Sequence, residues 1–403
     1  MRSDLVIPSL QKVKMWSFAD DDLDYLVRNC PSLRTLDLDT RGNAVTGPYL
    51  RLLTNLHQSL GELSLSMSNV YTAQPDKQLA EALVDIVRQC SNLKKVSLSG
   101  DSLQAAKFTE LCPFGHLFYE LEFPPIHRKR FQQPTEVVSN FLRECVNLRK
   151  LHFTSGRNND ALLVALKSCL LLEELDLSSF SFDTQKGELL GADLFRLINR
   201  HCKHFCKLRL ESSGVSESTL RHISGIEALQ ELVVDECEGE GMAGAGMAVL
   251  ATMGLAKLSI HSWTEAPVLP FVGSNISQTL ESFILKIYRD ELSPIGADRI
   301  TSSLASCPNL KSISIYFGDG CVFGDNGLAG LQAMAAGCPL LADVSFSSAA
   351  PGLHYIATHW TNLKKCSVLS GVSTDLRQEL LTLYPHIEWI LPTLDDDDSL
   401  SDG

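Results

Sequence analysis

The sequence has little of what a membrane-bound or secreted protein needs. Its longest apolar run without a charge, from Met242 to Ala256, is shorter than the roughly 18–20 residues of a membrane-spanning helix. The segment from Met1 to Pro8 lacks the apolar core of a signal peptide. Cysteine is sparse, with 12 in 403 residues, which excludes a disulfide scaffold and favours free thiols in a reducing compartment. These absences predict an intracellular protein, cytoplasmic or nuclear, with no membrane as a partner.

Positive charge is also in short supply. The chain has 35 lysines and arginines against 48 aspartates and glutamates, for a net charge of −13. Because an acidic surface repels phosphate groups, we expect no nucleic-acid partner.

Motifs of the common enzyme classes are missing as well. The chain has no G-x-S-x-G, no Walker loop, no H-E-x-x-H and no C-x-x-C. The segment from His201 to Cys206 is rich in histidine and cysteine, but Cys202 and Phe205 fall at repeat positions described below, which predicts packing instead of zinc binding. We therefore expect no catalytic residue, no metal and no cofactor, and an enzyme built on the repeats is the least favoured alternative.

One apolar pattern does recur along the chain. It consists of an anchor followed by apolar residues three and five positions later, as in Leu33-x-x-Leu36-x-Leu38. Counting a weak last copy, Ile387/Ile390, there are fifteen copies, with anchors 22 to 33 residues apart. The anchors are Leu10, Leu33, Leu60, Leu93, Phe118, Leu148, Leu172, Phe205, Leu229, Leu255, Leu280, Leu310, Leu341, Leu363 and Ile387. This is the pattern and period of a leucine-rich repeat.

Each repeat predicts one strand and one helix. The last two apolar positions lie two apart, so on a strand they face the same way, into a core. Apolar residues at helical spacing follow, as in Leu79, Leu83 and Ile86. Stacked units bury both faces, which predicts an α/β leucine-rich-repeat solenoid: a curved horseshoe with parallel strands on the concave face and helices on the convex face. We expect one domain over residues 1–392, with about 15 repeats, and a disordered acidic tail over 393–403.

Cysteine marks the register of seven repeats. It stands three residues before the anchor, at Cys30, Cys90, Cys145, Cys169, Cys202, Cys307 and Cys338. With Leu229-x-x-Leu232-x-Val234-x-x-Cys237, this resembles the cysteine-containing subtype of leucine-rich repeats, known from F-box substrate receptors of ubiquitin ligases and Amn1-like proteins. The resemblance implies a substrate-recognition role in a ubiquitin ligase complex. Since the repeats begin by Leu10, we expect the F-box itself to be absent or to lie in another chain.

The residues two, four and six positions after each anchor face away from the core and form a polar surface. Such a surface suits a protein partner, because small-ligand pockets are mostly apolar. A basic cluster after the fifth strand adds a contact for an acidic partner, or is simply a solvated loop. Trp16, near the end of the stack, is either an interface anchor or a cover for exposed core. The candidate partner-binding residues are Trp16, Asp37, Asp39, Glu122, Arg128, Lys129, Arg130, His152, Asp176, Arg209, His261 and Tyr316.

These observations favour a non-catalytic interaction or scaffold protein. It would bind one or more proteins, whose identity the sequence does not disclose, through the concave sheet and the loops that follow the strands. The ubiquitin-ligase role stays open as the alternative.

Overall fold

The structure is a computed structural model that describes residues 7, 9–16, 20–39, 46–67, 77–100, 107–123, 135–153, 167–178, 185–211, 215–237, 245–262, 270–287, 294–317, 328–347, 352–368 and 372–391. It forms two compact units, unit 1 from Met1–Phe180 with Arg196–Phe205, and unit 2 from Ser181–Phe195 with Cys206–Gly403. The predicted tail, residues 393–403, lies outside the described part. No helix in the ranges above is long and apolar enough to cross a membrane.

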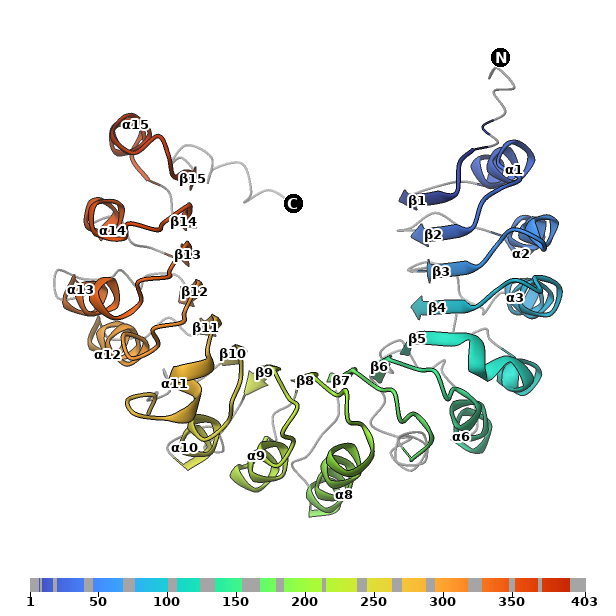
Figure 1. The fold of residues 1–403 in the computed structure, drawn as a ribbon, viewed down its shortest axis with the longest axis horizontal. Coiled ribbons are helices and arrows are strands. Elements are labelled where there is room, and N and C mark those ends of the chain that lie inside the picture. Colours follow the sequence, from blue (N-terminus) through green and yellow to red (C-terminus); the bar gives the residue numbers. More distant parts are fainter. Residues whose placement is uncertain are drawn as a thin grey trace, which may run out of the picture. The chain divides into compact units, whose positions relative to one another are not determined.

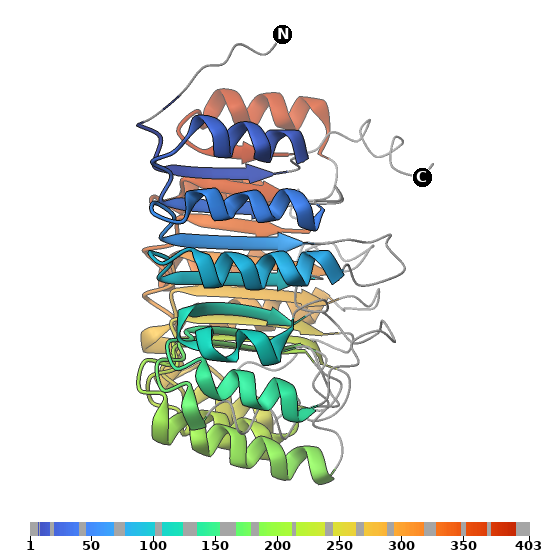
Figure 2. The same ribbon diagram turned by 90° about the vertical axis from the view of Figure 1, so that its right-hand side faces the viewer.

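Unit 1 alternates strands and helices. Its strands are β1 (Lys12–Trp16), β2 (Thr35–Asp39), β3 (Glu62–Met67), β4 (Lys95–Gly100), β5 (Phe118–Phe123), β6 (Lys150–Phe153) and β7 (Glu174–Ser178). Its helices are α1 (Asp20–Asn29), α2 (Gly47–Arg51), α3 (Lys77–Gln89), α5 (Phe108–Leu111) and α6 (Thr135–Glu144), with the 3₁₀ turns η1 (Leu52–Leu56) and η2 (Cys112–Leu117). Helix α8 (Gln185–His201) supplies residues to both units. Figure 2 shows β1 to β4 running in the same direction, with α1 to α3 in front of them.

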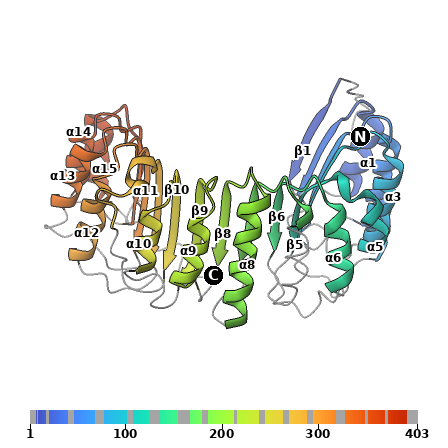
Figure 3. The same cartoon turned by 60° about the horizontal axis from the view of Figure 1, so that its bottom comes forward.

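Unit 2 repeats the same arrangement. Its strands are β8 (Lys207–Glu211), β9 (Glu231–Cys237), β10 (Lys257–Ser262), β11 (Ser282–Ile287), β12 (Ser312–Phe317), β13 (Asp343–Phe346), β14 (Lys365–Val368) and β15 (Glu388–Ile390). Its helices are α9 (Glu217–Ser224), α10 (Ala245–Ala251), α11 (Asn275–Thr279), α12 (Pro294–Leu304), α13 (Leu328–Gly337), α14 (Leu353–His359) and α15 (Thr374–Leu383). In both units the helices lie on one side of the strands (Figures 1 and 3).

The strands form a parallel sheet whose order follows the chain, from β1 to β15 in the described part. Inward residues of neighbouring strands lie side by side, so that Leu36 pairs with Leu63, and Leu63 with Val96. Every anchor from Leu33 to Ile387 is at most 4% exposed, as the repeat pattern predicted. The predicted helix residues Leu79, Leu83 and Ile86 are buried as well. The parallel strand order and the burial of the anchors and helix residues therefore confirm the predicted α/β solenoid.

The cysteine before each anchor has a structural role in the turn between helix and strand. The anchor N–H donates to the cysteine carbonyl, at 3.2 Å for Leu33 to Cys30 and 3.0 Å for Leu93 to Cys90. The thiols are buried and link neighbouring repeats: Cys169 Sγ donates to the Cys145 carbonyl oxygen at 3.4 Å. A small side chain with a weak donor fits this buried turn, which explains its recurrence.

A ladder of asparagines reinforces the same turns. Each stands directly before an anchor, and its Nδ2 donates to a carbonyl one repeat earlier. The contacts are Asn92 to Gln58 at 2.5 Å, Asn147 to His116 at 2.7 Å, Asn309 to Gln278 at 2.7 Å and Asn362 to Pro339 at 2.6 Å. Turn carbonyls that the strands leave unpaired are satisfied in this way, and adjacent repeats are joined.

The two ends of the stack depart from the prediction. In β15, Trp389 pairs with Cys366 and takes the inward position, whereas Ile390, expected to face inward, is 46% exposed. The two-residue offset from Ile387 predicted that Trp389 faces outward. Instead it lies beside the inward Cys366, and its indole Nε1 donates to the Tyr384 carbonyl at 3.3 Å. In the last copy the anchor Ile387 is therefore where the pattern placed it, but the strand residues after it lie one position out of the predicted register. At the other end the first anchor, Leu10, is only half-buried, and within the described residues a repeat adjoins it on the β2 side.

Trp360 occupies the cysteine position of the fourteenth repeat, three residues before Leu363. It is buried, and its indole Nε1 has no hydrogen-bond partner among the described residues. A buried donor without a partner costs about 1–3 kcal/mol. We therefore expect Trp360→Phe to unfold in denaturant at or above the concentration that unfolds the parent. Trp360→Ala is the control, expected to cost about 3–5 kcal/mol; equal losses in both variants would contradict this account.

Candidate interaction surfaces

The sheet has one face that the helices leave uncovered, called here the open strand face. Nine of the twelve predicted partner-binding residues lie on strands and project from this face, six in unit 1 and three in unit 2. Register brings some of them together: Trp16 pairs with Asp39, and His152 lies between Glu122 and Asp176. The basic cluster of Arg128, Lys129 and Arg130 lies outside the described residues.

In unit 1 the open strand face carries more acid than base. Lys14 Nζ is 2.9 Å from Asp37 Oδ2, and Lys150 Nζ is 3.0 Å from Glu174 Oε1. Asp176 was expected to lie on a solvated face, but it is only 9% exposed. Its direction from the sheet is as predicted, and its neighbours cover it. Asp176 is thus a poor contact residue in its own right.

Trp16 is the most exposed aromatic residue of this face. Its exposure is 65%, and Lys14 Nζ lies 5.6 Å from the ring centroid. It projects from the open strand face of β1. An exposed indole beside a cation has the character of an interface anchor.

In unit 2 the open strand face holds an ordered polar network. Asp235 Oδ2 accepts from Arg209 Nε at 2.7 Å and from Arg209 Nη2 at 2.6 Å. Asp235 Oδ1 is 2.5 Å from His261 Nδ1, and His261 Nε2 is 3.1 Å from Ser259 Oγ. Asp235 was missing from the predicted set, although the six-residue offset from Leu229 that defines outward positions would have found it.

Burial and charge oppose each other at Asp235. Burial by itself would raise the pKa of this carboxyl, but contact with His261 and Arg209 outweighs it and holds the pKa below its ordinary value. The carboxylate is therefore charged near neutral pH. Arg209 supplies compensating charge, and its contact with Asp235 fixes the position of the guanidinium on a side chain that is 45% exposed.

Ser259, His261 and Asp235 contact one another in the order of a serine-hydrolase triad. The surroundings do not suit catalysis. Ser259 is 8% exposed and lies in the middle of β10, which pairs with β9 and β11 on its two sides. Backbone N–H groups in a strand paired on both sides serve mainly the ladders, so few of them remain to stabilise an oxyanion, although the register with β9 shifts between Ile260 and Ser262. We interpret the trio as a network that positions charge.

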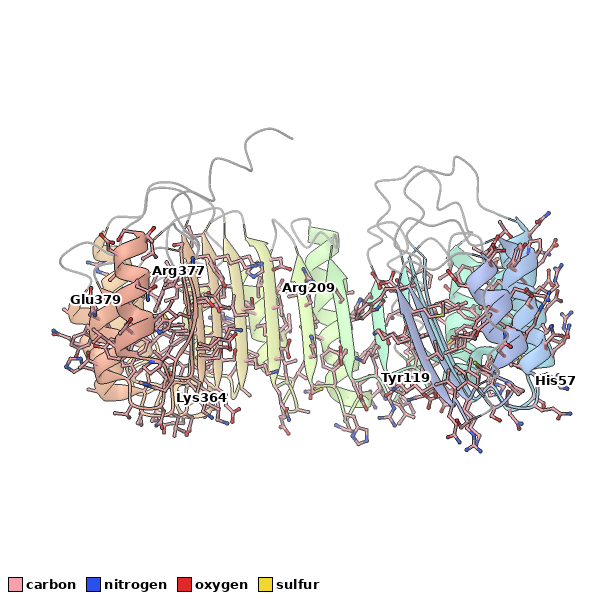
Figure 4. The ribbon with its side chains drawn as sticks, turned by 90° about the horizontal axis from the view of Figure 1, so that it is seen from above. His57, Tyr119, Arg209, Lys364, Arg377 and Glu379 are labelled. Atoms are coloured by element: carbon pink, nitrogen blue, oxygen red, sulfur yellow. The ribbon has the colours of Figure 1, made fainter. Side chains whose placement is uncertain are left out.

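Next to this network lies a second ordered pair. Tyr316 Oη is 2.9 Å from Ser345 Oγ, and Lys286 Nζ is 5.7 Å from the centroid of the Tyr316 ring. His261 and Lys286 pair in register on β10 and β11, and Lys286 and Tyr316 on β11 and β12. The predicted residues Arg209, His261 and Tyr316 therefore belong to one surface of unit 2, and Figure 4 shows Arg209 on the strands of that unit.

The histidine- and cysteine-rich segment does not form a metal centre. Cys202 and Phe205 are buried at their repeat positions, and His204 is exposed. Over the part of the chain that the structure describes, no three histidine, cysteine or acidic side chains gather in a way that could hold a metal ion.

Among solved structures, the chain is similar to yeast Rad7 in a complex with Elc1. The two share 16% sequence identity and a TM-score of 0.54, and the match covers 95% of this chain and 85% of that chain. The fold is a leucine-rich-repeat solenoid. The chain is also similar to TLR13 in a complex with ssRNA13, at 14% identity and a TM-score of 0.44; the match covers 91% of this chain and 47% of that chain, so this protein spans about half of its length. No protein-family model matches this leucine-rich-repeat chain, and no curated protein does.

Proposed function

We propose that this chain is a non-catalytic interaction module that binds a protein partner through its open strand face. The observation that carries the proposal is the network of Arg209, Asp235, His261 and Ser259, which holds a buried charge at the surface of the sheet. Burying a carboxylate is costly unless it is paired, and replacing such a pair by apolar residues is often neutral or stabilising. A protein that keeps a buried charged pair on an open surface can use the fixed charges of that pair in recognition.

The surroundings of the network favour a protein over a small molecule. Tyr316 and Lys286 add an aromatic ring and a cation on neighbouring strands. Charged and aromatic groups of this kind supply specificity and anchoring in protein interfaces. In unit 1, Asp37, Asp39 and Glu122 would complement a basic segment of the partner, with Trp16 as an anchor at the end strand. The basic cluster at Arg128 to Arg130 remains a predicted contact for an acidic segment.

The test is affinity purification from native lysate followed by mass spectrometry. We expect the parent chain to retain a stoichiometric protein, and the double variant Lys286→Glu/Tyr316→Ala to lose most of it. Arg377→Glu makes the same charge change on the exposed side of α15 and should retain it (Figure 4). Recovery of no stoichiometric protein, or equal retention by the double variant, would count against an interaction role for this face.

A substrate-recognition subunit of a ubiquitin ligase is the second candidate. Two observations favour it: the buried cysteines before the anchors, which resemble those of the subtype found in F-box receptors, and the likeness in fold to Rad7 in its complex with Elc1. Co-purification with a cullin-type adaptor tests it directly. Clean failure of that experiment, with the chain folded and a different partner bound, would remove this candidate and leave the interaction role intact.

A further inference from the structure

Unit 1 has a polar cavity at the edge of the sheet where the strands begin. Its volume is about 560 Å³, and it lies over the turns that lead into β2, β3 and β4. The lining includes Ser32, Arg34, Gln58, Gly61, Glu62 and Lys94. None of these belongs to the predicted partner-binding set.

The cavity exists because one repeat lacks a side chain. The residue directly after each anchor lies on this edge, and in unit 1 these residues are Gln11, Arg34, Gly61, Lys94, Tyr119, Arg149 and Glu173. Backbone hydrogen bonds make three of them direct neighbours: Gly61 N donates to the Arg34 carbonyl and Lys94 N to the Gly61 carbonyl, both at 2.8 Å. Gly61 thus leaves a gap between an arginine and a lysine. Figure 4 shows Tyr119, from the same row, at this edge.

The two cations beside the gap are uncommitted. Within the described residues, neither the Arg34 nor the Lys94 side chain has an ion-pair partner, whereas the nearby Lys95 is 3.9 Å from Glu62 and Arg149 is paired with Glu173. Glu62 is the one acidic residue of the described lining, and Lys95 offsets its charge. An anion in the gap would lie between the two cations and be attracted to both.

Hydrogen-bonding groups around the gap also favour an anion. The carbonyl oxygens of Arg34 and Gly61 each accept two backbone N–H groups, at 2.8 and 2.9 Å for Arg34 and 2.8 and 3.2 Å for Gly61. These two carbonyl oxygens are therefore already paired and turn little negative charge toward the gap. The guanidinium of Arg34, the ammonium of Lys94, the hydroxyl of Ser32 and the amide of Gln58 supply donors.

We propose that this cavity binds a phosphorylated side chain carried on a protein segment. A phosphate monoester brings nearly two negative charges and three acceptor oxygens, which match two cations and neighbouring donors better than a single carboxylate does. A compact anion is favoured over a nucleic acid because the net charge of −13 repels an extended polyanion. The site lies at the strand-start edge and not on the open strand face, so this inference and the proposed function can fail separately.

Fluorescence anisotropy with the full chain tests the site. The probes are three labelled peptides of one neutral sequence that differ at a single position, with phosphoserine, serine or glutamate, and a single-stranded oligothymidine. Titrated into the millimolar range at low salt, the phosphoserine peptide should bind about tenfold or more tightly than the serine and glutamate peptides. Equal binding of the phosphoserine and serine peptides, or of the phosphoserine and glutamate peptides, would overturn the proposal. Tighter binding of the oligonucleotide would overturn it as well.

Two variants locate the binding in the gap. Arg34→Ala/Lys94→Ala removes both cations, and Gly61→Glu places a carboxylate between them; each should lower affinity for the phosphoserine peptide about tenfold. A Cβ at position 61 would meet the Arg34 carbonyl at 3.6 Å and the Asn92 carbonyl at 3.7 Å, which is ordinary contact, so Gly61→Glu should fold. Circular dichroism checks this.

Unit 2 offers matched controls at the same repeat position. Lys364 and Ala342 each stand directly after an anchor. Away from the cavity, Ala342→Glu reproduces the charge change of Gly61→Glu, and Lys364→Ala removes one cation, half the charge that Arg34→Ala/Lys94→Ala removes. Both should bind the phosphoserine peptide as the parent does. If Ala342→Glu lowers affinity as much as Gly61→Glu, binding reflects overall charge and the cavity is not the site.

Discussion

Leu175→Asp is expected to lower the free energy of unfolding by about 5 kcal/mol or more. Leu175 is 1% exposed on β7, and its inward neighbour in the register is Leu151 of β6. Removing a buried leucine side chain costs about 2–5 kcal/mol, and burying an unpaired carboxyl adds to that. Since domains are typically stable by only about 5–15 kcal/mol, the change should unfold much of unit 1.

Chemical denaturation followed by circular dichroism measures this effect, and hydrogen exchange of the β6 and β7 amides locates it. Repeats contact chiefly their neighbours, so protection should be lost first around the substituted repeat. Leu170→Asp is the matched control, because Leu170 is 48% exposed in the turn before the same strand and should change stability by less than about 0.5 kcal/mol. Similar losses in both variants, or none in either, would show that the repeat register does not determine burial.

The repeat pattern predicted the inside of the molecule well. Residues three and five positions after an anchor point inward because side chains alternate on a strand, and Leu98, Leu177 and Ile260 are buried as this requires. The pattern failed in the last copy, where Ile387 and Ile390 lack a third apolar residue to fix the register. With one apolar residue misplaced by one position, Trp389 and Ile390 exchanged faces.

For the interaction surface, only the direction in which each side chain points was predictable. Alternation states which way Asp176 and His261 point, but how deeply each is covered depends on the lengths of side chains on adjacent strands. Asp235 obeys the same alternation, and its importance comes from two partners that lie 26 residues away along the chain in opposite directions. The cavity at Gly61 has the same origin, since it requires a missing side chain between two particular neighbours one repeat away.

The asparagine before several anchors is a local sequence feature whose structural role was not predicted. Cysteine followed by asparagine and the anchor marks the end of a helix in the sequence. In the structure, Asn92 and Asn309 each donate to a carbonyl of the preceding repeat. The asparagine therefore makes a contact between repeats, which one repeat taken alone cannot disclose.

Alkaline pH is expected to destabilise the folded chain steeply, because its buried thiols resist ionisation. Burial raises the pKa of the cysteine thiols from 9.0 to about 11 for Cys90, Cys202 and Cys338, and to about 12 for Cys169, Cys307 and Cys366. A pKa raised by folding stabilises the native state fully below the unfolded value, and that stabilisation is lost as pH rises toward the folded value. Stability should therefore be insensitive to these thiols below about pH 8.5 and fall between about pH 9 and 11.

The slope of that fall makes the expectation quantitative. Each thiol that ionises only when unfolded contributes about 1.4 kcal/mol per pH unit, so six of them remove several kcal/mol by about pH 10. Denaturation in urea across this pH range measures the total. Cys169→Ala should reduce the pH dependence of the unfolding free energy by the contribution of one thiol. Cys112→Ala, at a half-buried position, should reduce it less. A flat profile to about pH 10.5, or rapid reaction of these six thiols with Ellman's reagent in the native chain, would mean that they are not sealed inside the fold.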